Sequence, residues 1–115
     1  MGERKLAANT TTSRKHIEEI VKRIVSQFQP DKIILFGSHA RGEDGGDSDV
    51  DLLIVMPVSS SKRHTAVQIG VALHDIPLAK DIIVTTPEEF AWRKEVTGTI
   101  EYPADREGEV LYAGP

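Results

Sequence analysis

The residues best suited to do chemistry lie between positions 37 and 51, in the run GSHARGEDGGDSDVD. A Gly-Ser pair, Gly37 and Ser38, is separated by ten residues from two aspartates, Asp49 and Asp51, which have one residue between them. Glycine permits a positive φ angle and lets a ligand come close to the backbone. The pattern predicts a turn that holds a triphosphate, next to carboxylates that hold the magnesium accompanying it.

The two aspartates begin an almost continuous apolar run, DVDLLIVM at 49–56, which is typical of a strand covered on both faces. Side chains alternate along a strand, so Asp49 and Asp51 should share a face, roughly 7 Å apart along the backbone. Two neighbouring carboxylates on a buried strand repel each other and lose hydration. A cation between them relieves that cost, and Mg²⁺ commonly uses one or two carboxylates together with substrate phosphates.

Three further residues complete the expected site. The Ser38 hydroxyl adds a donor to the phosphate turn, and Arg41 is within reach of a phosphate group. Asp81 begins the next apolar run, DIIVT at 81–85. If its strand lies beside the first, three carboxylates meet at one sheet edge, where they could hold two metal ions. Asp81 could also accept the proton of an attacking hydroxyl.

The first element expected to support this site is a helix. Apolar residues recur at spacings of 3, 1, 3, 1 and 3, which predicts an amphipathic helix that is capped by Thr12 or Ser13 and ends before Pro30. The members of this stripe are Ile17, Ile20, Val21, Ile24, Val25 and Phe28. Residues 1–12 are polar or small, and we expect a flexible tail there. The predicted organisation is therefore a tail at 1–12 and a single domain at 13–115.

The remaining elements alternate along the chain. Strands are expected at 32–36, 49–56 and 81–85, a helix at 62–75, and a short final strand at 110–112. Thr86 should cap a last helix, with Pro87 at its first position and Glu89 closing a capping box. Phe90 and Trp92 on that helix are expected in the core. This alternation predicts an α/β fold in which helices pack on a sheet.

Composition narrows the function classes. A chain of 115 residues has room for one core, and it contains no cysteine for a disulfide, thiolate site or nucleophile. The net charge of −4 makes binding to a long nucleic acid unexpected. No apolar stretch reaches the ~18 residues of a membrane span. The N-terminus also lacks a signal-peptide core, so we expect a cytoplasmic protein.

The Gly-Ser pair, the ten-residue interval and the Asp-x-Asp pair resemble the signature of the nucleotidyltransferase superfamily that includes DNA polymerase β. The longer run GSHARGEDGGDSDVDLLIV is similar to its smallest members, the minimal nucleotidyltransferases, and KDIIVTTPEEF resembles their third-aspartate strand with the following helix. The resemblance covers residues 14–112. It implies a small mixed sheet with flanking helices (α/β, α+β). Pro103 departs from it by interrupting an expected longer helix.

The resemblance also implies an activity: transfer of a nucleoside monophosphate from an NTP, such as ATP, to a hydroxyl, with release of pyrophosphate. Asp49 and Asp51 would be ligands of Mg²⁺, with two ions at the site, and Asp81 would be a ligand or the general base. Gly37 and Ser38 would bind the triphosphate.

Larger members of the superfamily carry a further domain that binds the acceptor, so here we expect the acceptor surface on another molecule. Minimal nucleotidyltransferases commonly pair with a HEPN-domain toxin and, as antitoxins, add AMP to one of its tyrosines. Two alternatives remain: an antitoxin that neutralises its partner by binding alone, and an antibiotic-type small-molecule nucleotidyltransferase completed by homo-oligomerisation. The sequence does not identify the base of the NTP, the partner or the oligomeric state.

Overall fold

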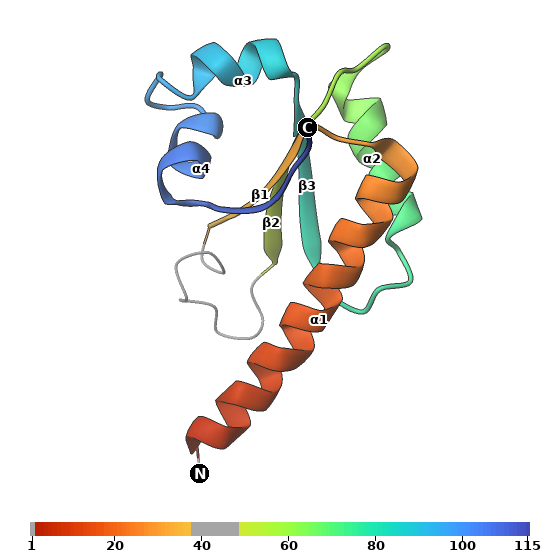
Figure 1. Cartoon of the computed structure of the whole chain (residues 1–115), viewed down its shortest axis with the longest axis vertical. Coiled ribbons are helices and arrows are strands. Elements are labelled where there is room, and N and C mark those ends of the chain that lie inside the picture. The colour runs from red at the N-terminus through yellow and green to blue at the C-terminus, as the bar shows by residue number, and fades with distance from the viewer. Residues whose placement is uncertain (1, 38–48) are drawn as a thin grey trace.

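The computed structural model describes residues 2–37 and 49–115 of the chain, with side chains from residue 14 onward. Four helices and four strands lie in this part of the chain, and Figure 1 shows their arrangement. In chain order they are α1 (Gly2–Phe28), β1 (Lys32–Phe36), β2 (Val50–Val55), α2 (Lys62–Ala72), β3 (Lys80–Thr85), α3 (Pro87–Arg93), α4 (Glu101–Glu107) and β4 (Glu109–Ala113).

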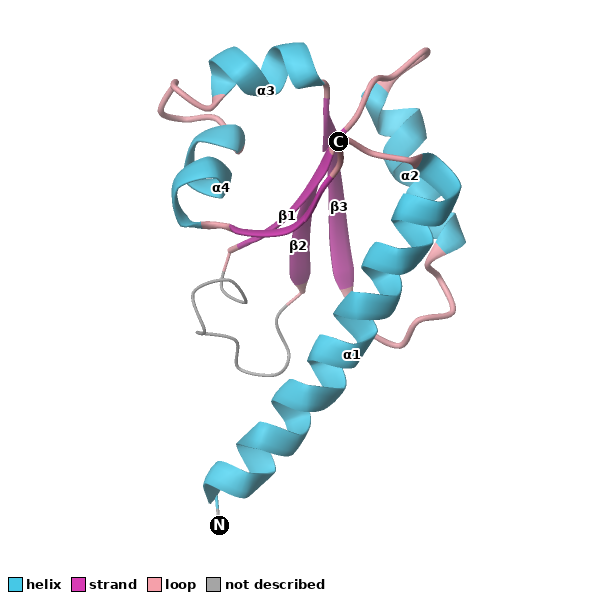
Figure 2. Cartoon of the chain, viewed as in Figure 1, coloured by secondary structure: helices cyan, strands magenta, loops and turns pink. Residues whose placement is uncertain are grey.

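The four strands form one mixed sheet in the order β3-β2-β1-β4 (Figure 2). β1 runs antiparallel to both of its neighbours, β2 and β4, whereas β2 and β3 are parallel. A parallel pair needs a crossover connection, and α2 supplies it between β2 and β3. The expected mixed sheet with flanking helices is confirmed, and so is the short final strand.

Helices cover both faces of the sheet, with α1 and α2 on one side and α3 and α4 on the other (Figure 1). Because strand residues alternate, β2 contributes to both layers, and its apolar residues are all buried. The α1/α2 layer contains Ile20, Ile24, Ile33, Leu52, Ile54, Ile69 and Leu73. The α3/α4 layer is smaller and contains Ile34, Leu53, Val55, Phe90 and Ala104.

Helix α1 differs from the sequence expectation at its start. Residues 2–12, expected to be a loose tail, are helical, so Thr12 and Ser13 lie inside α1 and do not cap it. The segment contains Glu, Arg, Lys, Leu and two Ala residues, all strong helix formers, and its lack of an apolar stripe hid this propensity. The stripe from Ile17 onward is buried as expected. Neither α1 nor another helix in the described part of the chain is long and apolar enough to cross a membrane.

The C-terminal third contains two short helices. The Thr86 side chain accepts a hydrogen bond from the Glu89 backbone N–H at 3.1 Å, and Pro87 occupies the first turn, as expected. The Glu89 carboxylate instead pairs with Lys62 on α2 at 2.7 Å. Pro103 lies in the first turn of the separate helix α4, where its missing N–H costs little, so it does not interrupt a longer helix.

The expectation for Trp92 was wrong. Phe90 is buried, but the Trp92 side chain is 56% exposed. The two residues are two positions apart on α3, so they point to different sides of a 3.6-residue turn and only one of them faces the sheet. The Arg93 guanidinium carbon lies 5.7 Å from the centroid of the Trp92 ring.

Candidate active site

The strand register brings two of the predicted carboxylates together. Asp51 on β2 is the direct partner of Asp81 on β3, in adjacent parallel strands. Paired residues in neighbouring strands lie about 5 Å apart and point to the same face. Asp51 is half-buried and Asp81 is exposed. Two acidic side chains separated by more than two dozen residues in the sequence therefore become neighbours at the start of these strands.

Asp49 lies one position before β2 and is exposed. The intervening Val50 is fully buried in the α1/α2 layer, so strand alternation directs Asp49 and Asp51 to the opposite face. Among the residues that the structure describes, however, no three acidic or histidine side chains lie close enough to hold one metal ion by themselves. The Asp49 side chain is exposed to solvent and does not form a three-carboxylate cluster with Asp51 and Asp81.

Gly37 directly follows the last residue of β1 and lies beside Asp51. Its φ angle is +79°, a left-handed conformation that strains any residue with a side chain. A Cβ added there would lie less than 3.0 Å from Asp51 Oδ2 and 3.3 Å from its Cγ. The absence of a side chain at Gly37 therefore leaves the space in which the Asp51 carboxylate sits.

Other predicted site residues lie outside the described part of the chain. Ser38 and Arg41, expected to bind the triphosphate, belong to residues 38–48, and so does His39. Their roles stay predictions.

The three aspartates lie at the less covered end of one sheet face. Leu53 and Ile83 come two positions after Asp51 and Asp81 and belong to the α3/α4 layer. Helix α3 begins at Pro87, after the far end of β3, so it packs away from the acidic end (Figure 1). A substrate from solvent can therefore reach Asp81, while the partner strands on both sides of β2 hold Asp51 in place.

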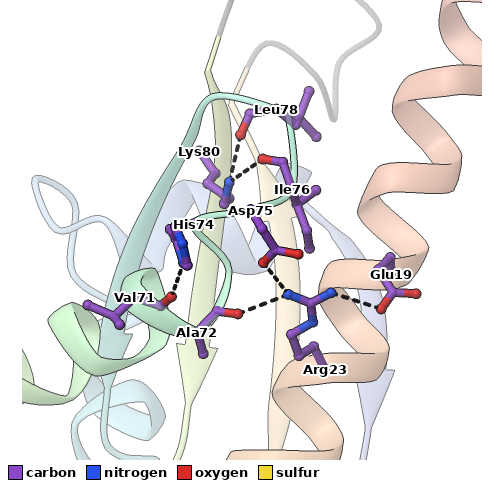
Figure 3. A network of polar contacts seen from close by, with 9 residues as sticks. All are labelled: Glu19, Arg23, Val71, Ala72, His74, Asp75, Ile76, Leu78 and Lys80. Atoms are coloured by element: carbon purple, nitrogen blue, oxygen red, sulfur yellow. Dashed lines mark hydrogen bonds and ion pairs between the residues drawn. The ribbon is translucent and has the colours of Figure 1, made fainter.

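A polar network braces the connection between α2 and β3, and sequence reasoning missed it (Figure 3). The Lys80 ammonium donates to the backbone carbonyls of Ile76 at 3.0 Å and Leu78 at 2.8 Å. Arg23 on α1 donates to the carbonyl of Ala72 at 3.0 Å and to Asp75 at 2.5 Å. In the sequence, this network is signalled by Lys80, which directly precedes the candidate catalytic residue Asp81.

The pKa values of Lys80 and Asp75 respond to this environment. Burial lowers the pKa of the Lys80 ammonium, and the charge of Asp75 offsets part of that shift. The hydrogen bond from Arg23 lowers the pKa of the Asp75 carboxyl. The network is therefore a set of charge-assisted hydrogen bonds that tie α1, the 72–78 connection and the start of β3 together.

The donor set suits a hard divalent cation. Asp51 and Asp81 offer only carboxylate oxygens, the ligands that Mg²⁺ prefers, and two protein carboxylates are enough when substrate phosphates complete the shell. The missing side chain at Gly37 leaves the room that the Asp51 carboxylate occupies, so this ligand lies directly against the backbone at the end of the first strand pair. The residues present therefore fit the metal that the nucleotidyltransferase resemblance implies.

Comparison with known proteins places this geometry in a family. The family model described as a nucleotidyltransferase domain matches residues 15–105, which include β1, β2, β3 and the three aspartates. The chain belongs to this nucleotidyltransferase domain family.

Individual relatives agree with this assignment. The chain is 49% identical over 43 residues to a Methanocaldococcus jannaschii protein named "Putative protein adenylyltransferase MJ0604". That match covers 36% of this chain and 43% of the relative, so it spans less than half of the relative's length.

Two solved structures share the fold. One, named a "putative nucleotidyltransferase" from Sulfolobus solfataricus, has a TM-score of 0.66 at 21% identity and covers 93% of this chain and 86% of its own. The other, a toxin-antitoxin structure with AMP-PNP, has a TM-score of 0.54 at 16% identity, with coverages of 84% and 73%. At these identities the two structures support the fold alone.

Proposed function

We propose that this chain is a magnesium-dependent nucleotidyltransferase that transfers AMP from ATP to a hydroxyl group of a partner protein. The observation that carries the proposal is the register pair Asp51 and Asp81, with Gly37 packed against the Asp51 carboxylate. A fold tolerates adjacent carboxylates on neighbouring strands at an electrostatic cost, and a bound cation removes that cost.

Each described residue has a distinct task in the proposed reaction. Asp51 is half-buried on the central strand β2 and paired on both sides, so it is the fixed metal ligand. Asp49 is exposed and would complete the metal site with Asp51 when the nucleotide binds. When bound, Mg²⁺ would offset the charge that develops on the phosphate oxygens.

Asp81 is a second metal ligand and also the candidate general base. It is exposed beside Asp51, so a hydroxyl on another molecule can approach it from solvent. The attacking hydroxyl oxygen forms a bond to the α-phosphorus, and its proton passes to the Asp81 carboxylate. The bond between the α-phosphorus and the bridging oxygen breaks, and pyrophosphate leaves. The catalytic contribution of the protein is then largely positioning and charge stabilisation.

The acceptor that we propose is a tyrosine of a HEPN-domain toxin, with this chain as the antitoxin. Two findings motivate this choice. The Methanocaldococcus jannaschii relative carries a protein adenylyltransferase name, and a toxin-antitoxin structure with AMP-PNP shares the fold. Tyrosine provides a phenolic hydroxyl that a carboxylate base can deprotonate as the bond to phosphorus forms.

The test is label transfer from α-phosphate-labelled ATP, with Mg²⁺, into a lysate of the source cells. Wild type is compared with the double variant Asp49→Asn/Asp51→Asn, which keeps side-chain size and removes both charges. The matched control is Asp75→Asn, which changes an exposed acidic residue of the α2–β3 connection that pairs with Arg23 of α1. We expect one labelled protein band with wild type and with Asp75→Asn, and none with the double variant.

The position of the label separates the alternatives. A labelled protein of toxin size, with AMP on a tyrosine by mass spectrometry, supports the proposal. If the double variant still protects cells from the toxin, neutralisation occurs by contact and catalysis is dispensable. Label that enters an aminoglycoside and no protein indicates a small-molecule transferase. Equal labelling by the double variant and wild type refutes the site assignment.

A further inference from the structure

The turn that leads into β3 is held by a side chain of β3 itself. Lys80 is the first residue of β3, and its ammonium donates to the Ile76 and Leu78 carbonyls, four and two residues earlier. The Leu78 N–H also donates to the Ile76 carbonyl at 2.8 Å, which tightens the same turn. Figure 3 shows the Lys80 side chain bent back over this segment. The turn at 76–79 is therefore closed by a charged hydrogen-bond donor.

This turn is also the first point at which β3 meets β2. The Val50 N–H donates to the Ala79 carbonyl at 2.9 Å, immediately before the strand pairs begin. The next pairs in the register are Val50 with Lys80 and Asp51 with Asp81. The position of the Ala79 carbonyl thus sets where the two strands start, and with it the alignment of the two carboxylates.

We propose that Lys80 is a positioning residue for the transfer reaction. By closing the turn at 76–79, its ammonium fixes the Ala79 carbonyl and so aligns Asp81 with Asp51. The side chain lies on the α1/α2 face of β3 by strand alternation, whereas Asp81 lies on the opposite face, so Lys80 acts through the backbone. This inference rests on the proposed function, because the consequence of misalignment is a slower transfer.

A matched pair of variants separates alignment from general stability. Lys80→Met keeps the apolar stem and removes the donor, while Lys80→Arg keeps the charge and the donors. Arg23→Met is the control, because Arg23 also donates to a carbonyl of the α2–β3 connection, that of Ala72, but from α1. Both methionine variants remove one cation that braces the same segment. Of these two cations, only Lys80 donates to the turn at 76–79, which contains the Ala79 carbonyl that accepts a hydrogen bond from the Val50 N–H.

The first readout is amide hydrogen exchange, which does not depend on activity. The Val50 and Met56 amides mark the two ends of β2. The Val50 N–H donates to the Ala79 carbonyl in the turn before β3, and the Met56 N–H donates to the carbonyl of Thr85, the last residue of β3, at 3.0 Å. In Lys80→Met we expect exchange at Val50 to accelerate relative to Met56. In Arg23→Met the ratio of the two exchange rates should stay at the wild-type value.

The second readout is the initial rate of AMP transfer at saturating ATP. We expect Lys80→Met to lower this maximal rate by about ten-fold or more, since small misplacements of reacting groups carry losses of that size. The ATP concentration for half-maximal rate should change little. Lys80→Arg should recover most of the rate, and Arg23→Met should keep it even where its melting temperature falls.

Several results would overturn the inference. The inference fails if Lys80→Met transfers AMP at the wild-type maximal rate. It also fails if Arg23→Met loses as much of this rate as Lys80→Met, because the loss would then follow from lower stability of the segment. Equal acceleration at Val50 and Met56 also contradicts local alignment. If the wild-type chain transfers no AMP, the proposed function falls. The exchange ratio then decides alone whether Lys80 aligns the strands, and an unchanged ratio overturns that role too.

Discussion

Substitution of Gly37 by alanine tests the geometry of the site most directly, because the same change can be made at a matched position. Gly37 and Gly98 both have positive φ angles, +79° and +96°. A Cβ at Gly98 would meet no atom within 4 Å, whereas a Cβ at Gly37 would collide with the Asp51 carboxylate. Gly37→Ala and Gly98→Ala therefore introduce the same kind of backbone strain, but only Gly37→Ala also places a methyl group against the Asp51 carboxylate.

The expected magnitudes follow from this difference. Alanine in a left-handed conformation costs about 1–2 kcal/mol, so Gly37→Ala and Gly98→Ala should both lower the free energy of unfolding by roughly that amount. At Gly37 the added methyl group must also displace the Asp51 carboxylate, or the end of β1 must move away from β2. A shift on the order of 1 Å in a reacting group can reduce the rate about 100-fold.

The assay combines urea denaturation with the rate of AMP transfer at saturating ATP, on wild type and both variants. We expect Gly98→Ala to keep the wild-type rate and Gly37→Ala to lose on the order of 100-fold. Similar losses of stability in the two variants exclude unfolding as the explanation. The reasoning is refuted if Gly37→Ala transfers AMP as fast as Gly98→Ala, because Asp51 would then not need the position that Gly37 leaves open.

Two further predictions concern the helices that pack near the sheet. The Thr85 hydroxyl donates to Glu101 Oε2 at 2.8 Å, and both residues are buried. Thr85→Val should therefore lower the free energy of unfolding, measured by urea titration, by about 2 kcal/mol. A loss below about 0.5 kcal/mol would contradict this role. The hydrogen bond from Lys62 lowers the pKa of the Glu89 carboxyl. Because the folded-state pKa is depressed, its stabilisation is present above the unfolded-state pKa and is lost as pH falls through the folded-state pKa. Melting temperatures of wild type and Lys62→Met should therefore converge as the pH falls below the ordinary glutamate pKa of about 4.3, and a difference that stays constant into acid would count against the pair.

Much of the fold follows from local patterns. The apolar stripe from Ile17 to Phe28 predicted the buried face of α1, and the runs at 32–36, 49–56 and 81–85 predicted β1, β2 and β3. The cap at Thr86 formed as expected. These signals are reliable because each depends on hydrophobic periodicity or on hydrogen bonds within one turn of the chain.

The errors arose where partners are distant in sequence. The exposure of Trp92 depends on which side of α3 faces the sheet, and the Glu89 carboxylate pairs with Lys62 of another helix although its capping-box position is correct. For Trp92 and Glu89 the deciding contact is with another element, so it is not visible in the local sequence. The start of α1 is a different case, because there the local helix propensity prevailed although the apolar stripe is missing.

By itself, the sequence determined the identities and spacing of Gly37, Asp49, Asp51 and Asp81, and with them the class of chemistry. Tertiary structure alone decided which of them are neighbours. Strand pairing placed Asp51 against Asp81, and Lys80 closes the turn that comes immediately before this pair. The physical reason is that carboxylate chemistry depends on separations of a few ångströms, and such separations between distant residues are fixed by backbone pairing across the sheet.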